Sequence, residues 1–102
     1  METISKEIIR RKNDQFRRTF VGGKVLLTQG VQYAPHLEEL IRTVKGFDDF
    51  NEGNDPYAEH DFGKLIVQGT SYFWKIDYFD SSYQYFQEDG RRVLTIMLAD
   101  EY

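Results

Sequence analysis

The chain has 102 residues, which is the size of one domain. It contains no cysteine, so disulfide bonds and thiolate metal sites are excluded, and this composition fits a reducing cytoplasm. The first residues, METISKEIIRRK, lack the apolar core of a secretory signal, and no apolar run approaches the roughly 20 residues that span a bilayer. We therefore expect one cytoplasmic domain over residues 1–102, without a membrane segment.

The net charge of −4 hides an asymmetry along the chain. Residues 1–24 hold seven Lys/Arg and three Asp/Glu, which gives 7 − 3 = +4. Residues 25–102 hold six Lys/Arg and fourteen Asp/Glu, which gives 6 − 14 = −8. This separation can steer charged partners toward the protein, or the basic segment can lie on the domain's own acidic surface.

The first 30 residues predict a helix followed by a strand. A helix over residues 3–20 is indicated by apolar residues at an approximate 3.6-residue period. These residues are Ile4, Ile8, Ile9, Phe16 and Phe20. Gly22-Gly23 ends the helix, because glycine accepts positive φ at no steric cost. The string KVLLTQ then predicts a strand over residues 24–29.

A second helix is predicted to begin at Pro35, since proline suits the first helical position. Glu38 and Glu39 lie near the positive end of its dipole. Its apolar stripe has spacings of three and four residues and consists of Leu37, Leu40, Ile41, Val44 and Phe47. Residues 51–61 then form a long polar loop.

The rest of the chain predicts three strands, over residues 63–69, 71–79 and 91–98, with a hairpin turn at Gly69-Thr70. In the middle strand, one face is apolar and packs on helices, while Lys75 and Asp77 share the opposite, partly wet face. The last strand is nearly continuously apolar, which favours a central place in the sheet. The order α-β-α-β-β-β predicts an α+β fold: a mostly antiparallel four-stranded sheet with two helices packed on one face.

Three strings together resemble a family of small bacterial proteins that carries a domain-of-unknown-function label. They are NDPYAEHDFG (54–63), FWKIDYFD (73–80) and RVLTIMLADEY (92–102), and RRTFVGGKVLLTQGV (17–31) and FDDF (47–50) extend the resemblance. The resemblance implies no activity, cofactor or catalytic residue. It implies accessory proteins of bacteria, often encoded beside plasmid or other mobile-element genes. That genetic setting resembles the one in which antirestriction and anti-CRISPR inhibitors are encoded.

The string NDPYAEHDFG allows two interpretations. Glu59, His60 and Asp61, joined in space by His36 or Asp77, would be metal ligands or acid–base groups of a small metal-dependent enzyme. The side chains of adjacent residues cannot easily point toward the same ion, however, and the sequence contains no H-E-x-x-H motif on a predicted helix. The alternative is a polar loop held by side-chain bonds to its own backbone. We favour the second interpretation and assign no catalytic residue, no metal ligand and no cofactor.

Two further sites would bind nucleic acid directly. The basic N-terminal helix offers a phosphate-binding cluster, made of Arg10, Arg11, Arg17 and Arg18. The string FWKIDYFD offers rings for stacking bases, although Asp77 and Asp80 among these rings would repel phosphate. Core packing and a solvated helix face are the ordinary explanations, so we rank direct nucleic-acid binding below protein binding.

The acidic part of the chain predicts a binding surface for a protein partner. Carboxylates on a rigid surface can imitate the phosphates of a duplex and occupy the Lys/Arg groove of a nucleic-acid-binding protein. The predicted partner-binding residues are Asp48, Asp49, Asp55, Tyr57, Glu59, His60, Asp61 and Asp80. We therefore expect a non-catalytic, acidic protein-binding module, whose sharpest form is an inhibitor of a nucleic-acid-targeting defence system of the anti-CRISPR or antirestriction type.

Overall fold

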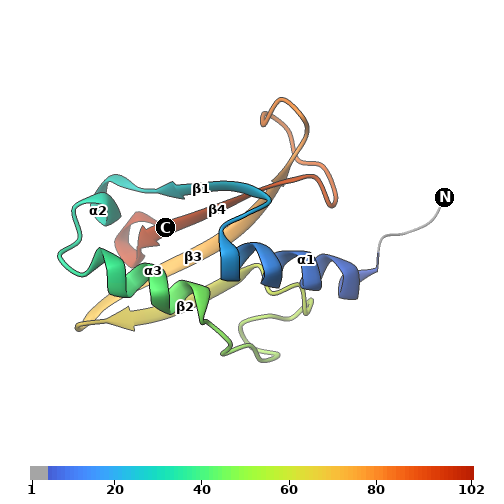
Figure 1. The fold of residues 1–102 in the computed structure, drawn as a ribbon. Helices are drawn as coiled ribbons and strands as arrows, with labels where there is room; N and C mark the ends of the chain where they lie inside the picture. Colours follow the sequence, from blue (N-terminus) through green and yellow to red (C-terminus); the bar gives the residue numbers. More distant parts are fainter. Residues whose placement is uncertain (1–4) are drawn as a thin grey trace.

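The computed structural model describes residues 5–102, which form four strands, three helices and a final 3-10 turn (Figure 1). In chain order they are α1 (Lys6–Thr19), β1 (Gly23–Leu27), α2 (Gln29–Gln32), α3 (Leu37–Lys45), β2 (Phe62–Val67), β3 (Thr70–Phe79), β4 (Arg91–Leu98) and η1 (Ala99–Glu101). The fold is α+β, as the sequence predicts. Within the described range no helix has the length and apolarity needed to cross a membrane.

The helix predicted over residues 3–20 corresponds to α1, and residues 3 and 4 lie outside the described range. Ser5 caps its start by accepting a hydrogen bond from the backbone N–H of Ile8. Phe20 ends it in the left-handed conformation, with φ 59°, and donates its N–H to the carbonyl of Phe16. Phe16 is buried as predicted, but Ile8 is 46% exposed because it lies to the side of the buried stripe.

The segment between β1 and α3 differs from the prediction. The strand expected over residues 24–29 ends at Leu27, and the one-turn helix α2 follows. Its cause is distant in sequence: the Glu101 carboxylate accepts hydrogen bonds from the Thr28 hydroxyl and from the N–H of Gly30. The second predicted helix begins at Leu37 rather than at Pro35. The local pattern could not reveal α2, because the carboxylate that holds this turn lies 71 residues from Gly30.

The four strands form one sheet in the order β1-β4-β3-β2. β1 runs parallel to β4, while β3 is antiparallel to both β4 and β2, so the sheet is mixed and mostly antiparallel. β4 is central, as its apolar run predicts. The β2–β3 hairpin turns at Gln68-Gly69 rather than at Gly69-Thr70, because Val67 pairs with Thr70. Both turn residues have positive φ, which matches the right-handed twist of the strands.

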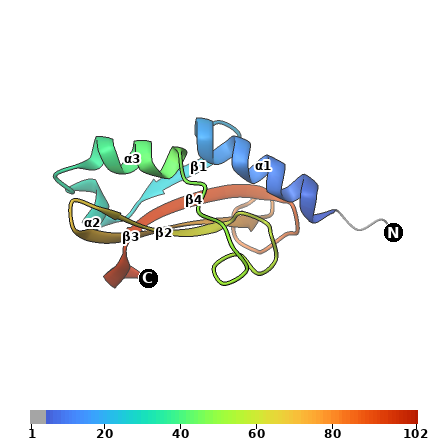
Figure 2. The same cartoon turned by 90° about the horizontal axis from the view of Figure 1, so that it is seen from below.

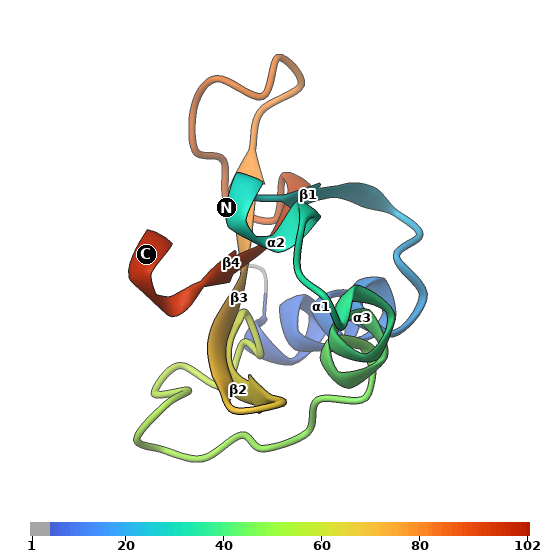
Figure 3. The same ribbon diagram turned by 90° about the vertical axis from the view of Figure 1, so that its left-hand side faces the viewer.

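The two longer helices, α1 and α3, cover one face of this sheet (Figure 2), as predicted. Alternate residues of β3 enter the core beneath them, among them Tyr72, Trp74 and Ile76, and Trp74 is fully buried. Within residues 5–102, the other face has no helix of this length, and η1 lies on that side (Figure 3). Lys75 and Asp77 lie there, half-buried, with 3.1 Å between the ammonium group and the carboxylate.

Candidate functional site

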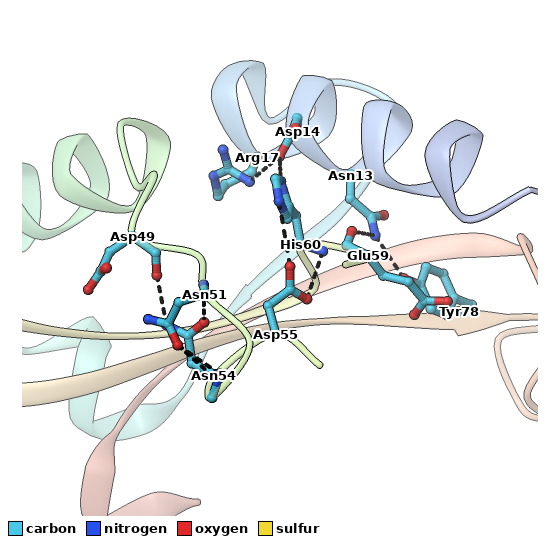
Figure 4. Close-up of polar contacts among 11 residues, drawn as sticks. Asn13, Asp14, Arg17, Asp49, Asn51, Asn54, Asp55, Glu59, His60 and Tyr78 are labelled. Carbon is cyan, nitrogen blue, oxygen red and sulfur yellow. Dashed lines mark hydrogen bonds and ion pairs between the residues drawn. The ribbon is translucent and has the colours of Figure 1, made fainter. Parts of the chain in front are cut away.

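The loop between α3 and β2 begins with a turn that its own side chains hold. Asn51 accepts hydrogen bonds at its side-chain oxygen from the N–H groups of Gly53 and Asn54. Asn54 in turn accepts one from the N–H of Asn51 and donates its amide to the carbonyl of Asp49 (Figure 4). Asn side chains favour such local bonds, so this part of the loop is ordered by its own sequence.

The second half of the loop is fastened to α1 through His60. Its Nδ1 lies 2.9 Å from Oδ1 of Asp14, and its Nε2 lies 3.5 Å from Oδ2 of Asp55 (Figure 4). The imidazole ring stacks on Phe50, with 3.7 Å between ring centres and 3° between planes. Asp55 also accepts the backbone N–H of His60. The side chains of His60 and Asp55 are therefore used for contacts inside the protein.

Beside this contact, Arg17 and Asp14 form an ion pair at 2.9 Å. Only 1% of the Arg17 side chain is exposed, and its guanidinium lies over the rings of both Phe50 and Trp74. Burial raises the pKa of Asp14, but the hydrogen bonds from Arg17 and His60 outweigh it, so this pKa is lowered. The loop, α1 and the sheet therefore meet at an ionised carboxylate.

Asn13, which lies one turn before Arg17 on α1, forms a buried polar network. Its amide donates to the carbonyl of Glu59 and to the hydroxyl of Tyr78, and its oxygen accepts from Nε of Arg92 at 2.6 Å. Arg92 continues to Asp89, which it contacts at 2.7 Å. Burial raises the pKa of Tyr78, so this hydroxyl stays neutral. The network fixes Glu59 relative to β3 and to the segment before β4.

Next to this network lies a cavity of about 370 Å³ with an acidic wall. Its carboxylates come from the loop, from β3 and from the segment before β4; they are Glu59, Asp61, Asp77, Glu88 and Asp89. Its apolar lining comes from Ile9, Ile76, Tyr78, Phe79 and Phe86. We call this site the acidic pocket. It forms where β3 continues past its last pairing with β2, at Lys75, and residues 85–87 become the neighbour of β3 instead.

The charge of the acidic pocket is only partly neutralised. Asp89 pairs with Lys12 and Arg92, and Asp77 pairs with Lys75. Within residues 5–102, the carboxylates of Glu59, Asp61 and Glu88 have no ion-pair partner. Three carboxylates in this hollow therefore have no direct ion pair in the described part of the chain.

Glu59 and Asp61 are electrostatically coupled. Burial, followed by repulsion from Asp61, raises the pKa of Glu59, although Lys6 partly offsets the shift. Burial also raises the pKa of Asp61, while its hydrogen bond with Glu59 lowers it. Both carboxyl groups therefore hold a proton more tightly than free ones do. A cation bound between them would reverse this effect.

The predicted partner-binding residues separate into four groups. Glu59 and Asp61 meet in the acidic pocket, whereas Asp55 and His60 point into the contact with α1. Asp80 caps its own loop by accepting hydrogen bonds from Ser82 and Gln84, which lower its pKa. Asp48, Asp49 and Tyr57 are exposed and do not line the pocket.

The sequence pattern did not single out several residues of this site. Glu88, Phe86 and the pair Asn13–Arg92 belong to it, and Asp77, predicted only as a helper, is one of its carboxylates. The one local signal was Asn13, a polar residue that follows Ile9 by four positions on the buried stripe of α1. Such a residue inside an apolar stripe indicates a buried hydrogen-bond network.

The predicted phosphate-binding cluster on α1 is divided in the fold. Arg10 and Arg18 are at least partly exposed, and Arg11 pairs with Glu7 at 2.6 Å. Arg17 cannot belong to an exposed cluster, because its side chain is buried beneath the helix. The period of α1 turns this residue toward the core, where aromatic faces and Asp14 accommodate its charge.

The metal-site interpretation of Glu59, His60 and Asp61 finds no geometric support in the described part of the chain. There, no three or more His, Asp and Glu side chains gather as ligands around one point. His60 faces Asp14 and Asp55, while Glu59 and Asp61 face the pocket. The φ of 55° at His60 contributes to this arrangement.

The comparisons with known proteins bear on the family alone. Neither the curated proteins nor the solved structures gave a match to the chain. A protein-family profile matches residues 27–101, which include α3, the loop and all of β2, β3 and β4. The chain thus belongs to the family described as "Protein of unknown function (DUF3768)".

Proposed function

We propose that this protein is a non-catalytic module that binds a basic protein partner through the acidic pocket. The observation that carries the proposal is the set of carboxylates that have no ion pair within residues 5–102, Glu59, Asp61 and Glu88, in one cavity. Like charges kept together in a partly buried hollow destabilise the fold unless a cation compensates them. A Lys or Arg side chain of a partner would supply that cation.

The walls of the pocket suit a long basic side chain. Phe86 is 74% exposed, and Tyr78 and Phe79 lie beside it, so aromatic faces accompany the carboxylates. Guanidinium and ammonium groups bind to aromatic faces as well as to carboxylates, and their alkyl stems cover apolar surface. The volume of about 370 Å³ lies in the range of ligand-binding clefts.

In its sharpest form, the proposal makes the partner a nucleic-acid-targeting enzyme of a defence system. The Lys/Arg groove of such an enzyme is built to receive phosphates, and carboxylates can take their place. The protein would then act as an inhibitor of the anti-CRISPR or antirestriction type. The negative charge of residues 25–102 would steer the encounter.

Affinity capture with matched variants tests the proposal. The pocket variant Glu59→Gln/Asp61→Asn/Glu88→Gln removes three negative charges at the site. The control variant Asp48→Asn/Asp49→Asn/Glu52→Gln removes three at exposed positions outside it. We expect wild type and control to retain a partner from bacterial lysate, identified by mass spectrometry, and the pocket variant to lose it.

Two further readouts separate the forms of the proposal. Purified partner should bind the wild type with an affinity that falls as salt increases, and the wild type should inhibit any nucleic-acid-targeting activity of that partner. Equal loss of capture in both triple variants would show that diffuse surface charge, and not the acidic pocket, binds the partner. Capture that the pocket variant retains in full would refute the proposal.

A further inference from the structure

The sheet face opposite α1 and α3 differs in charge from the rest of the protein. The register aligns Lys24 with Val93 and Val93 with Asp77, and it aligns Thr95 with Lys75. The strand residues on this face are Lys24, Leu26, Phe62, Lys64, Ile66, Ser71, Phe73, Lys75, Asp77, Phe79, Arg91, Val93, Thr95 and Met97. We call this surface the open face.

Cations outnumber anions on the open face. Its strand residues hold the side chains of Lys24, Lys64, Lys75 and Arg91 against the carboxylate of Asp77, which gives 4 − 1 = +3, while η1 on the same side adds Asp100 and Glu101. The whole chain has a net charge of −4, so the remainder is −4 − 3 = −7. Asp77 is paired with Lys75 at 3.1 Å. A positive surface on an acidic protein selects an anionic partner.

Aromatic rings lie at both ends of the open face. At one end, Tyr102 packs against Phe62 and Phe73, with ring centres 5.8 and 5.2 Å away. At the other end, the Tyr83 ring has the ammonium of Lys24 at 3.8 Å and the guanidinium of Arg91 at 5.6 Å from its centre. Each end therefore offers a ring surface close to a cation, since Lys64 pairs with Phe73 across the strands.

A shallow cavity of about 370 Å³ connects Tyr83 to the middle of the sheet. Its lining includes Lys24 and Lys75 as cations and Leu26 and Val93 as apolar floor. From Phe79 to Phe73 the strand covers six residues, or about 20 Å at 3.4 Å per residue. A ligand on this face would thus meet a ring at each end of this stretch and the Lys75–Asp77 ion pair between them, over a span of several nucleotides.

We propose that the open face binds single-stranded nucleic acid. Phosphates would contact Lys24, Lys64 and Arg91, and bases would stack on rings such as Tyr83 and Phe73. A single strand is the occupant that the surface favours, because its bases are available for stacking and its phosphates match the positive charge. The proposal does not depend on a protein partner at the acidic pocket, although the two sites share Asp77 and Phe79.

Fluorescence anisotropy with a labelled oligothymidine of about 12 nucleotides tests this inference. With three to four phosphate contacts, wild-type affinity should fall by about 20- to 50-fold between about 50 and 200 mM salt. The variant Lys24→Glu/Arg91→Glu should weaken binding and reduce the slope of log affinity against log salt by about 1.4. Tyr83→Leu, which keeps an apolar side chain without a ring, should weaken binding by about fivefold or more.

The matched control is Arg10→Glu/Arg18→Glu, which changes the net charge by the same amount on α1, on the other side of the sheet. We expect it to bind the oligonucleotide as the wild type does. The inference is overturned if the wild type does not bind at about 50 mM salt. Loss of binding in the α1 variant alone, or tighter binding of a duplex of the same length, would also overturn it.

Discussion

Nδ1 of His60 lies 2.9 Å from Oδ1 of Asp14, and this contact joins two segments 46 residues apart. Phe50 stacks on the same imidazole ring, so both halves of the loop between α3 and β2 converge on it. Neighbouring Glu59 is held to α1 as well, through its carbonyl and the amide of Asn13. His60 therefore has a structural role: it places the loop so that the side chains of Glu59 and Asp61 face the acidic pocket.

The first prediction concerns this histidine. His60→Asn removes the imidazole, but asparagine tolerates the left-handed conformation at φ 55°. Any loss of stability therefore comes from the side-chain contacts of His60. We expect the free energy of unfolding to fall by about 1–3 kcal/mol, because buried partners lose hydrogen bonds. Urea denaturation, monitored by circular dichroism, measures this fall in the free energy of unfolding.

His36→Asn is the control for the His60 variant. His36 is exposed at the N-cap of α3 and makes no capping bond with its side chain. Because Asn is favoured at this position, the control should be neutral or slightly stabilising. Equal urea midpoints for His60→Asn and wild type would show that the contact with Asp14 does not stabilise the loop.

The second prediction concerns acid stability. The pKa of Asp14 is lowered in the folded protein, so its ionised form stabilises the fold. This contribution is complete above the unfolded pKa of about 3.9 and is lost as pH falls through the lower folded value. Asp14→Asn should therefore be less stable than wild type at neutral pH, by about 1–2 kcal/mol. The difference should shrink toward zero below about pH 4.

Urea midpoints of the wild type and Asp14→Asn across this range measure the effect. Asp49→Asn serves as a control, because Asp49 is exposed and its side chain takes part in no ion pair within the described residues. A pH-independent difference between wild type and Asp14→Asn would mean that the carboxylate charge at this position does not stabilise the fold.

Much of the fold could be predicted because its signals are local. The alternation in β3 places Trp74 in the core and Lys75 on the opposite face, and the apolar run of β4 places that strand in the centre. The local pattern does not predict α2, because Glu101, far away in sequence, accepts the hydrogen bonds of Thr28 and Gly30 at its start. The parallel pairing of β1 with β4 likewise depends on tertiary packing, which a strand pattern alone does not encode.

The candidate site was harder to predict than the fold. Charge patterning indicated acidic residues, but it could not separate Glu59, which faces the pocket, from Asp55, which faces His60. That choice depends on the backbone of the loop, where both Ala58 and His60 have positive φ. Neither residue is a glycine, so the sequence carries no strong sign of this conformation.

The third prediction concerns close packing beneath the helices. A Cβ atom on Gly63 would lie 2.3 Å from Nε1 of Trp74 and 2.7 Å from the ring of Phe47, and both rings are buried. Gly63→Ala should therefore lower the free energy of unfolding by about 1–3 kcal/mol, since the core must move to admit the methyl group. Thermal and urea denaturation measure the loss.

Gly46→Ala is the matched control for this glycine. Gly46 follows α3 with φ −92°, and a Cβ there would meet only the Arg42 carbonyl at 3.5 Å, which is ordinary contact. This change should be neutral or stabilising by up to about 1 kcal/mol, because alanine reduces the entropy of the unfolded chain. If both variants were equally stable, the packing around Trp74 would be loose.

The fourth prediction concerns the two coupled carboxyl groups of the acidic pocket. Because the pKa values of Glu59 and Asp61 are raised, the folded state binds protons more tightly than the unfolded state does. Their contribution to stability is therefore favourable at low pH relative to neutral pH, and it is lost as pH rises through the folded values. Binding of a cation requires the ionised forms, so affinity for a basic partner should rise over the same pH range.

Asp61→Asn separates these two effects. Asparagine can still hydrogen-bond to Glu59, but it removes the like charge, so the pKa of Glu59 should fall toward its usual value in a carboxyl NMR titration. Stability at neutral pH should rise by about 0.2–0.5 kcal/mol, the scale of a relieved like-charge pair, while partner binding weakens. Glu52→Gln, an exposed change outside the pocket, should alter neither the titration nor the binding. An unchanged Glu59 titration in Asp61→Asn would show that burial alone raises the pKa, and the pocket would then lack the paired charge on which cation binding depends.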